Sequence, residues 1–288
     1  MQILVTGSNG MLGQDLVAHL QGGHGIIPVD LPEVDITDPQ GIEGVMGSTR
    51  PEVVIHTAAF TAVDECESRR DFAFQVNAEG TRNVAAACRK YRIPLLYIST
   101  DYVFDGDKPE PYLEGDPPRP INVYGQSKLE GEKHVSALVE EFWIVRTSWL
   151  FGPMGKNFVR AILEIARRDG SLQVVDDQIG APTYTMDLAA KLAQLIDGAP
   201  SGLYHVTNQG YCSWFDFARE ILRQVGLGHV MVSAISSSSL ERPARRPKNS
   251  RLANSRLVAE GLQLLPGWQD ALLRYLKRTE QIEARQSG

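Results

Sequence analysis

The chain has 288 residues, of which 43% are hydrophobic and 22% are charged, so it can bury a substantial core and is not a disordered sequence. Its formal net charge of −6 argues against a surface built to hold nucleic acid. No apolar run approaches the roughly 18 residues of a membrane span, and the first residues carry no basic flank or cleavage site. We therefore expect a cytoplasmic protein that contacts neither nucleic acid nor membrane.

Short strand-like runs alternate with longer helical stretches through the first two thirds of the chain. The pattern predicts strands at 3–6, 25–30, 53–57, 94–99, 142–147 and 172–175, and helices at 11–21, 71–91, 124–140 and 157–168. This alternation is typical of an α/β fold with a doubly wound parallel sheet of the Rossmann-like kind.

The pattern changes near residue 200. A strand-like run at 202–207 is followed by a helix at 213–225, a serine-rich run, a basic loop and terminal helices. We predict a dinucleotide-binding domain over residues 1–150, to which residues 170–198 return. Residues 151–169 and 199–288 are predicted to form a smaller C-terminal α/β cap that binds the substrate.

A glycine-rich turn joins the first strand to the first helix. Gly7, Gly10 and Gly13 have the spacing GxxGxxG, which lets the backbone approach a phosphate at the N–H groups of a helix N-terminus. An ordinary strand-to-helix turn is the alternative. Asp30, 17 residues after Gly13 at the end of the second strand, stands where a carboxylate would accept the adenine ribose hydroxyls. Together they predict a dinucleotide site that accepts NADH at least as well as NADPH.

Three residues predict acid–base chemistry on a carbonyl group. Tyr124 and Lys128 are four positions apart in a predicted helix, so both side chains leave from one face. An adjacent ammonium lowers the pKa of a phenol, which is about 10 when unperturbed, and so brings it closer to neutrality. Thr100 follows the strand at 94–99 and can donate a hydrogen bond to a carbonyl, although a capping role in the next turn is the alternative.

In chain order, the GxxGxxG turn, the threonine at a strand end and the YxxxK pair resemble the extended short-chain dehydrogenase/reductases. Longer motifs are similar to one family among them, the dTDP-4-dehydrorhamnose reductases. These motifs are STDYVFDG at 99–106, NVYG at 122–125, RTSW at 146–149, DQIGAPT at 177–183 and RRPKNS at 245–250. The resemblance extends from the first strand to about Leu252.

The resemblance implies reduction of the C4 ketone of dTDP-4-dehydro-β-L-rhamnose (dTDP-4-dehydro-6-deoxy-L-mannose) by NADPH or NADH. It makes Thr100, Tyr124 and Lys128 catalytic: Thr100 orients the ketone, Tyr124 protonates it, and Lys128 lowers the phenol pKa and holds the nicotinamide ribose. Beside the glycines, Tyr124 and Lys128, the implied cofactor contacts are Asn9, Met11, Leu12, Asp30, Asp35, Ile36, Ala58, Ala59 and Phe60. The implied substrate contacts are Thr100, Asp101 and Trp149.

A basic loop carries five positive residues within ten positions, namely Arg242, Arg245, Arg246, Lys248 and Arg251. Since arginine forks match phosphate oxygens, we expect Arg245 and Arg246 to bind the substrate pyrophosphate, with a solvated loop as the alternative. The acidic cluster at 64–67 is interpreted as the solvated start of a helix.

The sequence offers no full set of metal ligands. The three cysteines, at 66, 88 and 212, lack a CxxC spacing and are expected to be buried thiols, and the six histidines form no metal-binding pattern. The resemblance leaves open a homodimer and a divalent ion near Asp15.

Two other functions compete with reduction. One is a nucleotide-sugar epimerase or dehydratase on the same scaffold. The other is a non-catalytic regulatory subunit of methionine adenosyltransferase.

Overall fold

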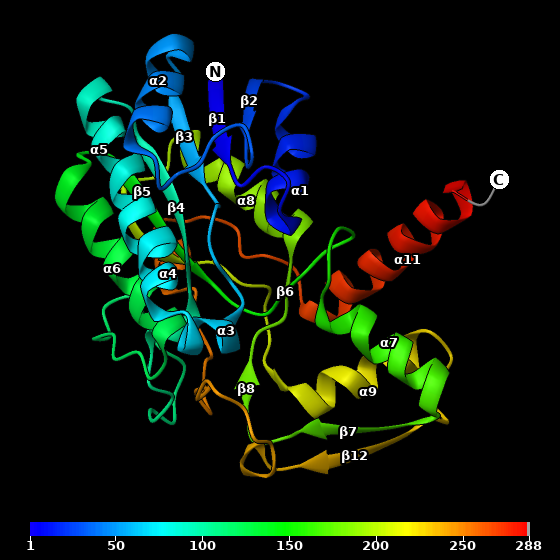
Figure 1. The fold of residues 1–288 in the computed structure, drawn as a ribbon. Coiled ribbons are helices and arrows are strands. Elements are labelled where there is room, and N and C mark those ends of the chain that lie inside the picture. The colour runs from blue at the N-terminus through cyan, green and yellow to red at the C-terminus, as the bar shows by residue number, and fades with distance from the viewer. Residues whose placement is uncertain (287–288) are drawn as a thin grey trace.

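A computed structural model describes residues 1–286, with side chains as far as residue 282, and its centre is a parallel sheet (Figure 1). The sheet has six strands in the order β10-β5-β4-β3-β1-β2, and every neighbouring pair is parallel. The strands are β1 (Gln2–Thr6), β2 (Gly25–Val29), β3 (Val53–His56), β4 (Leu95–Thr100), β5 (Phe142–Thr147) and β10 (Gly202–His205). The predicted α/β class with a doubly wound parallel sheet is confirmed.

Helices cover both faces of this sheet, as Figure 1 shows. On one face, α1 (Met11–Leu20) packs on α8 (Thr185–Ile196) through leucines that lie entirely in the core, including Leu16 and Leu192. The other face is covered by α2 (Pro39–Thr49), α5 (Thr81–Tyr91) and α6 (Val123–Leu138). Because both faces are buried, the central strands read as continuous apolar runs.

The long helix predicted at 71–91 is interrupted. It consists of α4 (Arg70–Phe74), a π-helical turn over Gln75–Gly80, and α5, and it is preceded by the short α3 (Val63–Ser68). Helix α2 was not predicted, because its three glycines weaken its helical pattern. Asp38 caps α2 by accepting a hydrogen bond from the Gln40 backbone N–H.

A second lobe lies beyond the carboxyl ends of the strands and has its own core of aliphatic and aromatic residues. Its helices are α7 (Phe158–Asp169), α9 (Trp214–Gln224) and α11 (Trp268–Gln286). Its strands form two pairs: β7 (Ser171–Val175) with β12 (Met231–Ile235), and β8 (Ile179–Gly180) with β11 (Cys212–Ser213). A third pair, β6 (Leu150–Phe151) with β9 (Thr183–Tyr184), follows β5, and α10 (Ser255–Ala259) packs near β10.

Two predicted elements lie elsewhere than expected. The run at 172–175 was predicted in the main sheet but pairs with β12. The first four residues of β7 alternate between exposed and buried, which is typical of a half-buried strand. Residues 199 onward were assigned to the cap, yet β10 forms the edge of the main sheet beside β5. The preceding helix α8 returns the chain to that edge, which is the usual route to a parallel strand. The remaining domain boundaries stay a prediction.

Candidate active site

A cavity of about 990 Å³ lies at the carboxyl edge of the main sheet. Its walls come from the loops after β1 to β5, the start of α6, and Trp214 of the second lobe. In an open α/β sheet, ligands bind at this edge, where the strand order reverses between β1 and β3. Apart from Arg245 and Arg246, every residue that the sequence predicted as catalytic, cofactor-binding or substrate-binding lines this one cavity.

The glycine turn packs so closely on the backbone around it that two of its positions have no room for a side chain. Gly7 has φ +69°, and a Cβ there would stand 2.6 Å from the backbone nitrogen of Ala58. A Cβ on Gly13 would stand 2.1 Å from the carbonyl oxygen of Gly7. Gly10 occupies the N-cap position of α1 and has no side chain to accept a hydrogen bond. The first backbone N–H groups of this helix, in the wall of the cavity, therefore have no side-chain acceptor. This geometry fits the diphosphate of a dinucleotide.

Asp30 ties the end of β2 to the glycine turn. Its carboxylate accepts hydrogen bonds from the backbone N–H of Asn9 at 2.7 Å and of Leu31 at 2.8 Å. Both carboxylate oxygens are thereby fixed at the cavity wall, beside Asp35 and Ile36. Lys128 is the sole basic residue among the described residues that line the cavity. The wall near Asp30 therefore has a negative charge and no cation of its own.

The three predicted catalytic residues converge. Thr100 ends β4, and its hydroxyl lies close enough to the Tyr124 phenol to lower the pKa of that phenol. Tyr124 and Lys128 lie one turn apart at the start of α6. Burial lowers the pKa of the Lys128 ammonium to about 7, although Glu132 one turn further acts in the opposite direction. Burial also raises the pKa of the Tyr124 phenol above its usual value. The sequence predicts that Lys128 lowers this pKa, whereas in the structure burial raises it, so the phenol keeps its proton at neutral pH.

Two further groups shape the inner end of the cavity. Asp101 is buried, accepts a hydrogen bond from the Thr100 hydroxyl at 3.0 Å, and has its pKa raised by burial to about 7. The indole of Trp149 stacks on Trp214, with ring centroids 3.5 Å apart and an interplanar angle of 7°. The sequence did not predict that Trp214 lines the cavity, because it lies 65 positions from Trp149 and in the other lobe.

The basic loop lies within residues 242–254, which we call the strap. Arg246 does not line the cavity; its guanidinium donates to both Asp64 oxygens, at 3.0 and 2.7 Å. The carbonyl oxygen of Arg245 accepts from the Asn122 amide at 2.8 Å, and its side chain is exposed. Asp64 and its neighbours do begin a helix, but they are not merely solvated, because Asp64 holds Arg246 and Glu67 accepts from the Val123 N–H at 2.9 Å.

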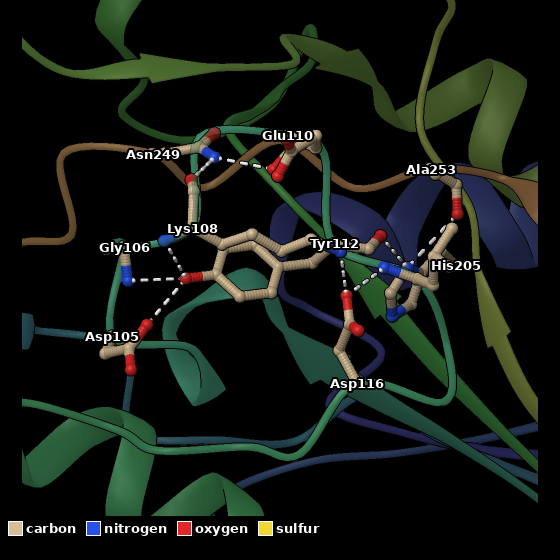
Figure 2. A network of polar contacts seen from close by, with 10 residues as sticks. Asp105, Gly106, Lys108, Glu110, Tyr112, Asp116, His205, Asn249 and Ala253 are labelled. Carbon is tan, nitrogen blue, oxygen red and sulfur yellow. Dashed lines mark hydrogen bonds and ion pairs between the residues drawn. The ribbon is translucent and has the colours of Figure 1, made fainter.

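A polar network fastens the strap to the loop between β4 and α6 (Figure 2). The Tyr112 hydroxyl donates to Asp105 at 2.6 Å and accepts from the Gly106 N–H at 3.0 Å. The Asn249 amide donates to the carbonyl oxygens of Lys108 and Glu110. Motif residues at 105–106 and 249 thus hold the chain that leads into Tyr124, rather than facing the cavity.

The other polar candidates have structural partners. Cys66, Cys88 and Cys212 are buried free thiols, as predicted. Asp15 is buried, accepts from the Thr185 hydroxyl, and has a pKa raised by burial. Within the described residues, no three His, Cys, Asp or Glu side chains are grouped so as to hold a metal ion. No helix in this part of the chain combines the length and apolar character needed to cross a bilayer.

Comparison with known proteins gives a consistent result. The family model described as "RmlD substrate binding domain" matches residues 1–281. A dTDP-4-dehydrorhamnose reductase of Streptomyces griseus is 43% identical over 276 residues, which cover 93% of this chain and 91% of that protein.

Solved structures agree with this match. A dTDP-4-dehydrorhamnose reductase of Bacillus anthracis in complex with NADP has a TM-score of 0.94 at 42% identity and covers 96% of this chain and 99% of its own. Another, from Clostridium acetobutylicum, has a TM-score of 0.95 at 41% identity, with 97% and 100% covered. A UDP-glucose 4-epimerase of Thermus thermophilus, at 23% identity, shares the fold.

Proposed function

Since this chain belongs to the dTDP-4-dehydrorhamnose reductase family, we propose that it reduces the C4 ketone of dTDP-4-dehydro-β-L-rhamnose to dTDP-β-L-rhamnose with NADPH or NADH. The observation that carries the proposal is the convergence of Thr100, Tyr124 and Lys128 with the glycine turn in one cavity. A reductase needs a proton donor beside its dinucleotide site, and this cavity provides both.

The cofactor would lie along the carboxyl edge of the sheet. Its diphosphate would meet the N-terminus of α1 at the glycine turn, and its adenine ribose would meet Asp30. Ile36 and the backbone at 58–60 would flank the nucleotide, and Lys128 would hold the nicotinamide ribose. When bound, the dihydronicotinamide supplies the hydride for the carbonyl carbon.

The protein's own residues would manage the proton. Tyr124 keeps its proton because burial raises the pKa of the phenol, so it can donate to the carbonyl oxygen as negative charge develops there. The Thr100 hydroxyl donates to Asp101 in this structure and would turn that hydrogen bond toward the substrate carbonyl. The Lys128 ammonium would stabilise the tyrosinate left after the transfer.

The second lobe and the strap would bind the nucleotide sugar. Asp101 would accept hydrogen bonds from sugar hydroxyls, and Trp149 would form the apolar wall against the sugar or base. Arg245 extends from the strap as an exposed cation suited to the diphosphate. Arg246, predicted as its companion, has its charge paired with Asp64, so we assign it an indirect contribution.

The test is a steady-state assay that follows NAD(P)H absorbance with dTDP- and UDP-linked 4-keto sugars. We expect stoichiometric oxidation with the dTDP sugar, and a fall in kcat of about 10²- to 10⁴-fold for Tyr124→Phe, which keeps the ring but loses the proton donor. Arg245→Ala should raise the KM of the nucleotide sugar more than that of the cofactor. Isomerisation of a nucleotide sugar without net NAD(P)H oxidation would instead indicate an epimerase, and a fully active Tyr124→Phe would remove Tyr124 from the chemistry.

A further inference from the structure

Tyr102 occupies a position between the catalytic residues and the strap. It follows Thr100 and Asp101 in a short 3₁₀ turn (Asp101–Val103), where its backbone N–H donates to the Thr100 hydroxyl oxygen at 3.2 Å. Its side chain lines the cavity together with Tyr124. Tyr102 belongs to the STDYVFDG motif at 99–106, but the resemblance assigned it no role.

The side chain of Tyr102 packs directly against the proposed proton donor. The two phenol rings meet edge to face, with centroids 5.9 Å apart and an interplanar angle of 78°. This is a favoured geometry for aromatic pairs, since the positive edge of one ring meets the negative face of the other. The orientation of the Tyr124 ring is therefore limited by the position of the Tyr102 ring.

The far end of Tyr102 is anchored in turn. Burial raises the pKa of its phenol, and the guanidinium of Arg246 lies close enough to the hydroxyl to oppose that rise. That guanidinium is itself fixed by Asp64 and by the carbonyl oxygen of Ala244 at 2.9 Å, and the Arg246 side chain is only 12% exposed. A bidentate arginine–carboxylate pair of this kind is rigid as well as strong.

Helix α3 supports both Arg246 and the start of the helix that carries Tyr124. Asp64 lies on α3, and Glu67, three positions further on the same helix, accepts from the Val123 N–H in the first turn of α6. Asn122 caps that turn and also donates to the strap at Arg245. Helix α3 and the strap therefore hold the start of α6 and the ring that packs on Tyr124 in one rigid frame.

We propose that Tyr102 is a positioning residue for Tyr124, and that the Asp64–Arg246 ion pair acts on the reaction by fixing the Tyr102 ring. This rests on the proposed function, in which Tyr124 donates the proton. A proton donor must be held close to the productive geometry, and a ring supported at its hydroxyl and at its edge has little freedom to turn. Arg246 then influences turnover without touching the substrate.

The test compares Tyr102→Phe, Asp64→Asn and the double variant with the unmodified enzyme. Tyr102→Phe keeps the ring and removes the contact with Arg246, whereas Asp64→Asn weakens the anchor and leaves Tyr102 intact. We expect each to lower kcat about tenfold, because a ring that can turn no longer holds Tyr124 in place, and to leave the KM of the sugar and the Kd of NADPH within twofold. The double variant should lose little more than either single one, because both changes act on the same chain of contacts.

A second readout separates positioning from general damage. With cofactor deuterated at the transferred position, the isotope effect on kcat should rise in both variants, because the chemical step becomes more limiting. The matched control is Asp187→Asn, which breaks another bidentate pair, to Arg274 at 2.6 and 2.7 Å, among residues outside the cavity lining. It should lower the thermal midpoint without changing kcat or the isotope effect.

Each outcome decides a separate question. An unchanged kcat in Tyr102→Phe, or losses that multiply in the double variant, would overturn the positioning role. A raised sugar KM at normal kcat in Asp64→Asn would show instead that the freed Arg246 governs substrate binding. If Asp64→Asn fails to fold, Tyr102→Phe and its isotope effect still decide the matter. Failure of the unmodified enzyme to oxidise NAD(P)H with any dTDP-4-keto sugar would reject the proposed function itself.

Discussion

At the scale of the single residue, Asp30 has one structural role and one proposed role in cofactor binding. Its carboxylate holds the glycine turn at Asn9, and its negative charge stands where the ribose 2′-position would lie. We expect kcat/KM for NADH to equal or exceed that for NADPH, because the carboxylate accepts a hydroxyl and repels a phosphate. Asp30→Ala should shift the ratio toward NADPH.

Both ratios should be measured at one fixed ionic strength, because salt screens this repulsion. Asp30→Asn serves as the control, since it removes the charge but keeps an acceptor for the turn. A strong NADPH preference in the unmodified protein would contradict the prediction and would point to a phosphate-binding group outside the wall of the cavity.

Lys128 couples the active site to stability. Its pKa is lowered by burial to about 7, from the 10.5 of an exposed lysine. Between these pH values the unfolded chain binds a proton that the folded protein has released, so the free energy of unfolding rises with pH. Lys128→Met should lose that rise.

The measurement is urea unfolding of both proteins at several pH values between 6 and 10. The advantage of the unmodified protein over Lys128→Met should grow as pH increases, and a constant difference would show that Lys128 titrates normally. The same variant should lose both turnover and cofactor affinity, since one ammonium is assigned to the tyrosine and to the ribose.

Most of the cavity could be predicted from local sequence, because the residues that end parallel strands meet at one edge of the sheet. The glycine turn, Asp30, Thr100 and the Tyr124–Lys128 pair are all of this kind. The contacts of Arg246 could not be predicted, because its partner Asp64 is 182 positions away and the pairing depends on the path of the strap. The positive charges of the basic loop predicted an anionic ligand, but the anion that Arg246 binds in the structure is the Asp64 carboxylate.

At the scale of the element, the first turn of α6 sets the position of the proposed proton donor. A Cβ on Gly125 would stand 2.0 Å from the carbonyl oxygen of Tyr102, so this turn and the 3₁₀ turn after β4 are in close backbone contact. Gly125→Ala should displace the helix start and lower kcat by at least tenfold, even though alanine is the better helix former.

Gly44→Ala in α2 is the matched control, since nothing lies within 4 Å of its Cβ. That change should leave kcat intact and raise the free energy of unfolding by about 0.5–1 kcal/mol. Equal activity of the two variants would show that α6 can shift without cost to Tyr124.

Strand patterns also explain which elements could be predicted. β4 is buried along its whole length and was correctly placed in the main sheet, whereas β7 exposes Ser171 and Gln173 and belongs to a two-stranded sheet. Alternation distinguishes the two environments, but a five-residue strand gives too short a pattern to decide its partner. β10 has only four residues, and its position depends on the path that α8 gives the chain.

At the scale of the whole molecule, β10 joins the C-terminal third of the chain to the main sheet. Arg256 of α10 supports it: the guanidinium donates to the carbonyl oxygens of Ser201 and Leu203 and lies 4.4 Å from the Tyr204 ring centroid. Arg256→Ala should lower the free energy of unfolding by about 1–3 kcal/mol.

The loss should appear together in tryptophan fluorescence and in circular dichroism, because the edge strand ties both lobes into one cooperative unit. Arg223→Ala removes an exposed arginine from a helix-surface pair with Glu220 and should change the free energy of unfolding by less than about 1 kcal/mol. Separate transitions for the two probes would show that the lobes unfold independently.

The path of the chain bears on how such an enzyme could be redesigned. The chain leaves the sheet after β5, returns for α8 and β10, and then leaves it again for α9 and β12. A chimaera cut at a single junction after β5 would therefore exchange the edge strand along with the second lobe, so that β5 would have to pair with a strand from the other protein. Exchanging the whole second lobe with that of a relative requires three segments exchanged together, from β6 to β9, from β11 to β12 and α11, with α8, β10 and α10 retained from the host.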